Sequence, residues 1–467
     1  MSEHVSLQTL RAAGRQPTLP FVLALADGGR LEFVRLLRLL PGRRLAGVAA
    51  WNGQSVFAKL FIGAEATRHG ERERAGLVAL QAAGLPTPAL HFAGALAEGG
   101  YLVLCDYLDG AVALDEQPLS PEAPQALLPA MALLGRLHAA GLVQRDLHPG
   151  NFLCHGERLL LIDGDGVRPA ASAAALADNL ALLLAQLTPA WDQLQGALLQ
   201  AYGRPVDAAA LAKLVAAARQ RRLQHFLAKT VRDCSQFAVH RDFRRFTAVL
   251  RDEEAALHSL LAEPDAAMAA GRLLKDGGTC TVAAVDLAGR TLVVKRYNLK
   301  HWRHALSRAW RPSRAWHSWQ AAHRLDFYGI ATPQPLALVE ERLGPLRSRA
   351  FLIAEHCPGA NLQTCLDPAQ LPPPDLQQAL HQLFATLHRL QISHGDLKAT
   401  NLLWHDGQIV LIDLDALVQH RSANGFARAW RRDRARLLRN WPAGSALVEW
   451  LAQANVPNQL DSSACAA

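Results

Sequence analysis

One loop-and-strand pattern occurs twice in this chain, and the repeat limits the folds that the chain can adopt. The first copy, LHAAGLVQRDLHPGNFLCHGERLLLIDGD, ends at Asp165, and the second, HGDLKATNLLWHDGQIVLIDLD, ends at Asp415. Each copy has an Asp, an Asn five residues later, and a second Asp after an apolar strand. The pairs, each 250 positions apart, are Asp146 and Asp396, Asn151 and Asn401, and Asp163 and Asp413. Solenoid repeats span only about 20–50 residues, so this spacing predicts two copies of one domain.

This trio of side chains suits phosphoryl transfer, and the pattern resembles the protein-kinase-like fold. One carboxylate takes the proton of an incoming hydroxyl group, while an amide and a second carboxylate hold Mg²⁺ against nucleotide phosphates. We therefore expect Asp146 and Asp396 to be catalytic bases. Lys398, two residues after Asp396, is expected to neutralise the transferring phosphoryl group. The expected metal ligands are Asn151, Asp163, Asn401 and Asp413.

A lysine lies within an apolar strand in each half of the chain. The segment SVFAKLF carries Lys59, and RTLVVKRY carries Lys295. An ammonium group is costly to bury without an anionic partner, so both lysines are expected to bind the phosphates of ATP; a lysine at a sheet edge is the alternative. The helix expected after the first strand offers Glu73 as the carboxylate that orients Lys59, with Glu71 as the alternative.

The resemblance implies an α+β protein with two tandem protein-kinase-like domains. Each domain would have a small antiparallel β N-lobe and a reduced helical C-lobe. A chain of 467 residues is long enough for two hydrophobic cores. Residues 206–261 are expected to be helical, and the boundary is placed near residue 250, which gives domains 1–250 and 251–467. No long activation segment follows Asp163, which favours a small or lipid-linked acceptor over a protein.

Two features depart from the kinase pattern. Neither half contains G-x-G-x-x-G, so the loop that would cover the phosphates is degenerate. Aligning Gly329 with Gly84 places Ser318 where Glu73 stands, so the second half lacks the expected helix glutamate. The candidates to replace it are Glu340, Glu341 and Glu355.

A basic, tryptophan-bearing segment spans residues 295–325 and contains no acidic residue. Arginine suits phosphate recognition, and tryptophan suits a sugar face or a membrane interface. The alternative is an amphipathic helix whose tryptophans pack on the sheet, as we expect for at least two of Trp302, Trp310, Trp316 and Trp319. Together with YGIATP after it, the segment resembles lipopolysaccharide core (heptose and Kdo) kinases. The resemblance implies an ATP- and Mg²⁺-dependent kinase that phosphorylates a sugar hydroxyl of the inner core.

Composition is compatible with this interpretation. The formal net charge is +8, which suits an anionic partner such as a phosphorylated glycolipid. The seven cysteines are scattered without a Cys-x-x-Cys pair, as expected in a reducing cytoplasm. The start of the chain does not resemble a signal peptide, and no window reaches about 18 uninterrupted apolar residues, so membrane contact is expected to be peripheral, at the cytoplasmic face of the inner membrane.

Two other readings of the sequence stay open. The protein could phosphorylate another small-molecule or protein acceptor, because HPGN after Asp146 resembles the loop of antibiotic and choline kinases. Alternatively, one or both domains could be a pseudokinase scaffold in lipopolysaccharide assembly, which the degenerate loops favour. No nucleic-acid motif accompanies the positive charge, so a nucleic-acid partner is not expected. The sequence does not indicate an oligomeric state.

Overall fold

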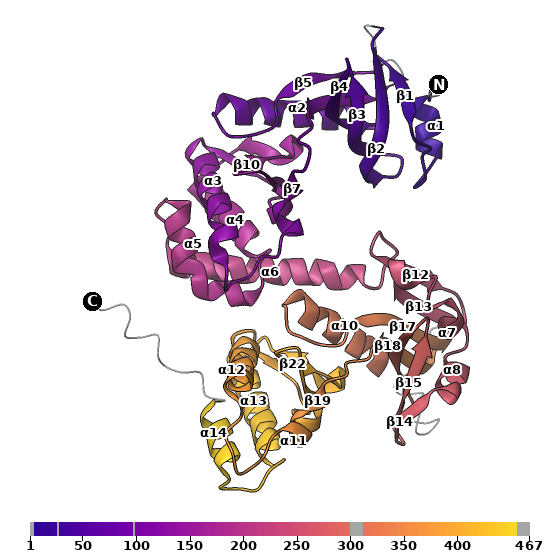
Figure 1. Cartoon of the computed structure of the whole chain (residues 1–467), viewed down its shortest axis with the longest axis vertical. Coiled ribbons are helices and arrows are strands. Elements are labelled where there is room, and N and C mark those ends of the chain that lie inside the picture. The colour runs from indigo at the N-terminus through magenta and orange to yellow at the C-terminus, as the bar shows by residue number, and fades with distance from the viewer. Residues whose placement is uncertain (1–3, 26–27, 97–98, 299–311, 345, 455–467) are drawn as a thin grey trace. The chain divides into compact units, whose positions relative to one another are not determined.

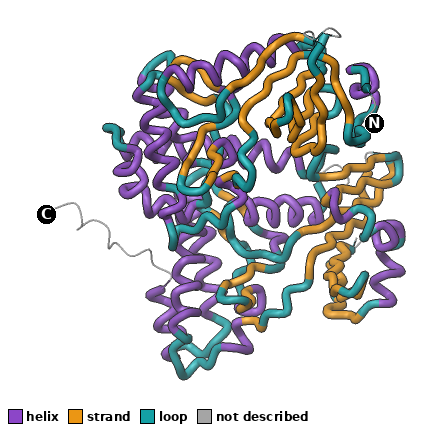
Figure 2. The backbone as a smooth tube through the Cα atoms, turned by 45° about the horizontal axis from the view of Figure 1, so that its top comes forward, coloured by secondary structure: helices purple, strands orange, loops and turns teal. Residues whose placement is uncertain are grey.

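The computed structural model describes residues 4–25, 28–96, 99–298, 312–344 and 346–454. The chain divides into two compact units, Met1–Gln220 and Arg221–Ala467 (Figure 1). Each unit combines antiparallel sheets with helices, which is an α+β architecture. Figure 2 shows how strands and helices are distributed along the backbone.

The first unit begins with a six-stranded antiparallel sheet in the order β1-β2-β3-β4-β6-β5. Its strands are β1 (Phe21–Ala24), β2 (Arg30–Leu40), β3 (Arg44–Trp51), β4 (Gln54–Phe61), β5 (Leu90–Ala95) and β6 (Tyr101–Asp106). Helix α1 (Leu7–Ala12) precedes the sheet, and α2 (Ala66–Ala82) connects β4 to β5. Asn52 and Gly53, a pair typical of tight hairpins, form the turn between β3 and β4 with positive φ angles of 48° and 78°.

The rest of the first unit is mainly helical. Its helices are α3 (Leu128–Ala139), α4 (Ala173–Leu184), α5 (Gln195–Tyr202) and α6 (Ala208–Lys229), the last of which continues into the second unit. Short strands lie between them: β7 (Val112–Ala113), β8 (Leu142–Gln144), β9 (Phe152–His155), β10 (Arg158–Leu161) and β11 (Val167–Pro169). Leucines of α3 and α4, including Leu134 and Leu180, form the buried core of this part.

The second unit contains a seven-stranded antiparallel sheet in the order β12-β13-β17-β18-β16-β15-β14. Its strands are β12 (Phe237–Arg241), β13 (Arg245–Leu250), β14 (Arg272–Asp276), β15 (Cys280–Leu287), β16 (Arg290–Tyr297), β17 (Pro335–Leu343) and β18 (Leu346–Glu355). Helices α7 (His258–Ala262) and α8 (Pro264–Ala270) lie between β13 and β14, and α10 (Arg314–Phe327) precedes β17.

The expectation of helix throughout residues 206–261 is wrong, and this moves the boundary. Helix α6 ends at Lys229, and β12 and β13 then pair with each other and with β17. Asp242 turns the chain between the two strands, because its Oδ1 accepts hydrogen bonds from the backbone N–H groups of Arg244 and Arg245. The segment before residue 250 therefore belongs to the second unit, which begins at Arg221.

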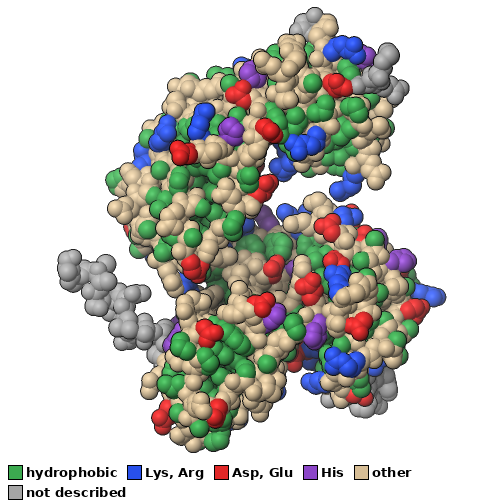
Figure 3. Space-filling model, in the orientation of Figure 1, with side chains coloured by type: hydrophobic (Ala, Val, Ile, Leu, Met, Phe, Trp, Pro, Cys, Tyr) green, Lys and Arg blue, Asp and Glu red, His purple; other side chains and the backbone are tan. Residues whose placement is uncertain are grey.

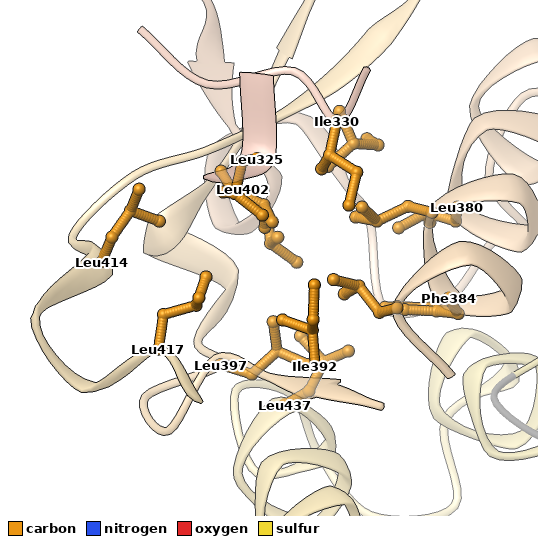
Figure 4. Close-up of a cluster of buried hydrophobic side chains, with 14 of the residues drawn as sticks. Leu325, Ile330, Leu380, Phe384, Ile392, Leu397, Leu402, Leu414, Leu417 and Leu437 are labelled. Atoms are coloured by element: carbon orange, nitrogen blue, oxygen red, sulfur yellow. The ribbon is translucent and has the colours of Figure 1, made fainter. Parts of the chain in front are cut away.

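The helical part of the second unit surrounds a leucine-rich core (Figure 4). Its helices are α11 (Leu362–Cys365), α12 (Pro374–Arg389), α13 (Ala423–Leu438) and α14 (Ala446–Ala454). Its short strands are β19 (Ala360–Asn361), β20 (Ile392–Ser393), β21 (Leu402–His405), β22 (Gln408–Leu411) and β23 (Val418–Gln419). Leu380 and Phe384 of α12 contribute to this core with Leu402 of β21, so the loop at residues 394–401 lies on a packed support.

Candidate active sites

In the first unit, the strand lysine is held by two carboxylates. β4 is an interior strand that pairs with β3 and β6, and it carries Lys59. The Nζ atom of Lys59 lies 2.5 Å from Oε1 of Glu73 on α2 and 2.8 Å from Oδ1 of Asp163. The alternative, Glu71, instead accepts hydrogen bonds from the Tyr101 hydroxyl and the Arg74 guanidinium. The structure thus brings Lys59, Glu73 and Asp163 together from three separate elements.

The turn after Asp163 is hydrogen-bonded to Glu73 on α2. Asp163 has a left-handed backbone (φ 72°), which turns the next two backbone N–H groups toward the helix. Gly164 donates to Oε1 of Glu73 at 3.2 Å, and Asp165 donates to Oε2 at 3.0 Å. One buried carboxylate therefore fixes both the lysine and the turn.

Electrostatics keep Lys59 and Asp163 charged. Burial lowers the pKa of the Lys59 ammonium. Glu73 and Asp163 together raise it by more than burial lowers it, so the pKa lies above its ordinary value. Burial raises the pKa of Asp163, but the opposing effect of Lys59 is larger and the pKa falls to about 2. At neutral pH this site presents an ammonium group and an ionised carboxylate side by side.

A cavity of about 680 Å³ opens beneath the first sheet. Lys59, Glu73, Asn151 and Asp163 all line it. Asn151 Oδ1 accepts a hydrogen bond from the backbone of His148 at 2.8 Å, which holds the loop in shape. Asp146 lies on the same loop but is exposed and is not part of the cavity lining.

The strand lysine of the second unit is also held by two carboxylates, but here both come from the turn after β22. Lys295 Nζ lies 2.5 Å from Oδ1 of Asp413 and 2.9 Å from Oδ1 of Asp415. Asp415 Oδ1 also accepts hydrogen bonds from the hydroxyls of Tyr297 and Ser318, both at 2.7 Å. Burial raises the pKa of Asp415, yet Lys295 and these hydrogen bonds lower it below its ordinary value.

Asp415 therefore occupies the place at Lys295 that a helix glutamate was expected to fill. The three glutamates considered as substitutes do not contact Lys295 in the described structure: Glu340 pairs with Arg342 and Arg347, Glu341 pairs with Arg349, and Glu355 lines the cavity. Those expectations are wrong because the replacement comes from the turn after β22. The Asp-x-Asp spacing at the end of both repeats was the signal that could have revealed it.

Asp396, the expected catalytic base of the second unit, is fixed by basic side chains. Asp396 Oδ1 lies 2.7 Å from Nη1 of Arg436 on α13, and Oδ2 lies 3.0 Å from Nζ of Lys398. Asn401 Nδ2 donates to the backbone oxygen of Asp396 at 2.8 Å. Burial raises the pKa of Asp396, but Lys398 and Arg436 bring it below its ordinary value, so the group is ionised at neutral pH. Sequence reasoning did not assign a role to Arg436.

A second cavity, of about 640 Å³, lies between this loop and the second sheet. Lys295, Asn401, Asp413 and Asp415 line it. Carboxylate and amide oxygens are the ligands that Mg²⁺ prefers, and Mg²⁺ usually takes its remaining ligands from phosphates and water. The donor sets Asn151 with Asp163 and Asn401 with Asp413 fit such an ion. Within the described ranges, no group of three or more His, Cys, Asp and Glu residues is arranged to hold a metal alone.

The basic tryptophan segment is only partly described. Residues 299–311, with Trp302 and Trp310, lie outside the described ranges. Trp319 is fully buried, and its Nε1 donates to the backbone oxygen of Thr230 at 3.2 Å. Trp316 packs on Phe246 with the ring centroids 5.2 Å apart. Both described tryptophans of this segment therefore pack inside the second unit.

Among the described helices, none has the length and apolar character needed to cross a bilayer.

A lysine on an interior strand, paired with carboxylates beside a loop that supplies Asp and Asn, defines the class of protein-kinase-like folds. Comparison with known families makes the assignment more specific. Residues 270–454 match the model of the Lipopolysaccharide kinase (Kdo/WaaP) family.

Curated relatives match over shorter stretches. The chain is 31% identical over 150 residues to the RIO-type serine/threonine-protein kinase Rio1 of Haloferax volcanii, covering 30% of this chain and 48% of that one. It is 40% identical over 62 residues to a probable bifunctional tRNA threonylcarbamoyladenosine biosynthesis protein of Methanospirillum hungatei, covering 13% of this chain and 11% of that one. The chain thus spans about half of the first relative and about a tenth of the second.

Solved kinase structures show distant similarity. WaaP in complex with acyl carrier protein aligns with a TM-score of 0.33 at 18% identity, over 45% of this chain and 88% of that one. Vaccinia related kinase 3 aligns with a TM-score of 0.26 at 16% identity, over 35% of this chain and 57% of that one.

Proposed function

We propose that this protein is an ATP- and Mg²⁺-dependent kinase that phosphorylates a sugar hydroxyl, of heptose or Kdo, in the lipopolysaccharide inner core. The observation that carries the proposal is the Lys295–Asp413 ion pair of 2.5 Å inside the region that matches the Kdo/WaaP family model. In this proposal the two units are tandem copies of one kinase-like domain, and the second unit carries out the transfer.

Each side chain of the second unit has a role in the proposal. Lys295 binds the nucleotide phosphates, and Asn401 and Asp413 hold Mg²⁺, which neutralises phosphate charge when bound. Asp396 accepts the proton of the sugar hydroxyl, because its lowered pKa keeps it ionised. Lys398, 3.0 Å from Asp396, faces the transferring phosphoryl group.

The first unit offers the corresponding set of groups. Lys59, oriented by Glu73, would bind nucleotide phosphates, while Asn151 and Asp163 would hold Mg²⁺. Asp146 would be its base. This unit lies outside the region matched to the family, so we propose nucleotide binding there without assigning it the transfer to the core sugar.

The short connection after each metal-binding Asp supports a sugar rather than a protein acceptor. Helix α13 begins at Ala423 soon after Asp413, and α4 begins at Ala173 soon after Asp163. Neither connection has room for a long activation segment on which a peptide would bind. The acceptor would be the core glycolipid, reached by peripheral contact at the cytoplasmic face of the inner membrane.

The test is phosphate transfer from labelled ATP with Mg²⁺ to a dephosphorylated core glycolipid, using the purified full chain. We expect incorporation by the native protein and its loss in Asp396→Asn. Core phosphate content should also fall in a strain that lacks the protein. No incorporation, together with unchanged core phosphate in that strain, would contradict the proposal and favour another acceptor or a pseudokinase scaffold.

A further inference from the structure

The cavity of the first unit is covered by an arginine-rich hairpin instead of a glycine-rich loop. Strands β2 and β3, joined at Pro41-Gly42-Arg43, lie next to the lysine strand β4. Arg35, Arg38 and Arg44 of this hairpin all line the cavity. Figure 3 shows Lys and Arg side chains on the face of the first unit near these strands.

A β-bulge between Leu36 and Arg38 explains how Arg35 and Arg38, three positions apart, reach one face. The register between β2 and β3 shifts between Phe33 and Arg35 and again between Leu36 and Arg38. In a regular strand, residues three apart point to opposite faces, but each bulge adds one residue and reverses that alternation. Leu36 therefore packs toward the core cluster of the sheet, while Arg35 and Arg38 both face the cavity.

The register also aligns these arginines with the lysine. Arg38 is opposite Ala46, and Ala46 is opposite Lys59 on the next strand. Side chains in such a row lie on the same face of a sheet. Gly47, which is opposite Leu36, lets the two strands approach closely, because a Cβ atom there would lie 2.0 Å from the backbone oxygen of Arg35. The row of positive groups is thus set by the backbone geometry.

The arginines leave much of their hydrogen-bonding capacity unused. Arg35 donates one hydrogen bond to the hydroxyl of Tyr107 at 2.7 Å. Across the described part of the chain, neither Arg38 nor Arg44 forms an ion pair with a carboxylate, and Lys59 is already neutralised by Glu73 and Asp163. Guanidinium groups form paired hydrogen bonds with phosphate oxygens.

We propose that the first unit binds the polyphosphate chain of a nucleoside triphosphate through Arg38 and Arg44, with Arg35 beside them. These side chains supply the donors that backbone N–H groups of a glycine-rich loop would otherwise provide. The proposal rests on the nucleotide site proposed for the first unit and identifies the residues that hold its phosphates. The second unit differs, because the turn of its corresponding hairpin contains Gly277 and Gly278 and only Lys275 lines its cavity as a basic group from β14.

The test is calorimetric titration of the full chain carrying Lys295→Met and Asp413→Asn, which disable the second site. The probes are ATP, ADP and adenosine. We expect Arg38→Gln and Arg44→Gln each to weaken ATP binding by about tenfold or more, because a hydrogen bond to a charged group contributes about 1.5–3 kcal/mol. Adenosine binding should stay unchanged, and Arg38→Lys should recover part of the loss. Arg30→Gln, at the other end of β2 and outside the cavity lining, is the matched control and should bind ATP normally.

The other outcomes are distinguishable. If the arginine variants bind ATP as tightly as their parent while Lys59→Met does not, the nucleotide site stands and the arginine assignment is overturned. If the parent binds none of the probes, both the arginine assignment and nucleotide binding by the first unit are overturned. Transfer by the second unit is tested separately through Asp396, so neither result bears on it.

Discussion

The hydroxyl of Ser318 donates a hydrogen bond of 2.7 Å to Asp415, and the same carboxylate oxygen lies 2.9 Å from Lys295. Ser318 is on α10, at the position that corresponds to Glu73 on α2. Its short side chain leaves room for the carboxylate that approaches from the turn after β22. In the first unit the corresponding Asp165 pairs with Arg72 at 2.8 Å instead. The two units thus hold their strand lysines with different second carboxylates, Glu73 in the first unit and Asp415 in the second.

Asp415→Asn is expected to impair the second site without unfolding it. The amide keeps the shape of the carboxylate but removes one of the two charges that hold Lys295. Mispositioning of a phosphate-binding group can lower the rate on the order of 100-fold. Steady-state kinetics of phosphate transfer measure this, with Asp406→Asn as control, because Asp406 is exposed in the β21–β22 turn. Equal rates in native protein and Asp415→Asn would contradict a role for Asp415.

Adding Ser318→Glu to Asp415→Asn should restore part of the activity. The double substitution returns a carboxylate to the helix position that Glu73 occupies in the first unit. It tests whether Lys295 needs a second carboxylate or needs Asp415 in particular. No recovery in a folded double variant would show that the turn carboxylate has a further role.

Asp146→Asn and Asp396→Asn are expected to have unequal effects on phosphate transfer. Asp396 is fixed by Arg436 and Lys398, whereas no basic side chain pairs with Asp146 in the described ranges. A positioned general base contributes about 10²–10⁴-fold, so we expect a loss of that size for Asp396→Asn and less than about tenfold for Asp146→Asn. The measurement is phosphate incorporation into core glycolipid. If both single variants and the double variant match the native protein, the enzymatic proposals fail.

The sequence predicts the parts of the sites that depend on local pattern. Lys59 and Lys295 are recognisable because an ammonium within an apolar strand needs a carboxylate partner, and the structure supplies Asp163 and Asp413. The Asn52-Gly53 turn is recognisable because both residues tolerate positive φ. Predicting these features requires only the neighbouring residues in the sequence and general chemistry.

Features that depend on distant pairing were missed. The sequence predicts helix over β12 and β13 because arginine and alanine favour helix locally, and only the pairing of these segments with each other and with β17 makes them strands. Asp415 and Arg436 were missed because their partners lie more than 30 residues away, on elements whose approach the sequence does not reveal. The cavity-facing arginines of β2 were missed because bulges break the two-residue alternation.

Gly76→Ala is expected to destabilise the first unit. A Cβ atom at Gly76 on α2 would lie 1.9 Å from the backbone oxygen of Gly164. Gly164 is in the turn whose backbone N–H groups donate hydrogen bonds to Glu73. Backbone atoms cannot move aside as a flexible side chain can, so the helix and the turn would separate. We expect a loss of about 1–3 kcal/mol in the free energy of unfolding, although alanine favours helix by about 1 kcal/mol over glycine. Denaturant unfolding measures the change.

The matched control is Gly196→Ala in α5. Nothing lies within 4 Å of a Cβ atom placed there, so only the helix preference operates. We expect this variant to be more stable by up to about 1 kcal/mol. If both substitutions stabilise the protein equally, the close packing of α2 on the turn is not a constraint.

His323 is a buried histidine in an aromatic cluster of the second unit. Its ring lies 4.2 Å from that of Trp319 and 5.2 Å from that of Phe237, both edge to face. In the described structure its Nε2 atom has no hydrogen-bond partner. Burial lowers the pKa of His323 to about 3, from the ordinary value of 6.5.

His323→Phe is expected to reduce the sensitivity of the protein to acid. Below pH 6.5 the unfolded chain takes up a proton at this histidine that the folded chain binds only near pH 3, so stability is lost as the pH falls through this window. The loss is about 1.4 kcal/mol per pH unit, or about 2 kcal/mol between pH 6.5 and pH 5. The phenylalanine variant should lack this loss, while exposed His258→Gln should behave as the native chain does. Denaturant unfolding at pH 7 and pH 5 measures the difference, and the same pH dependence in His323→Phe and native protein would show that His323 is protonated without cost in the folded state.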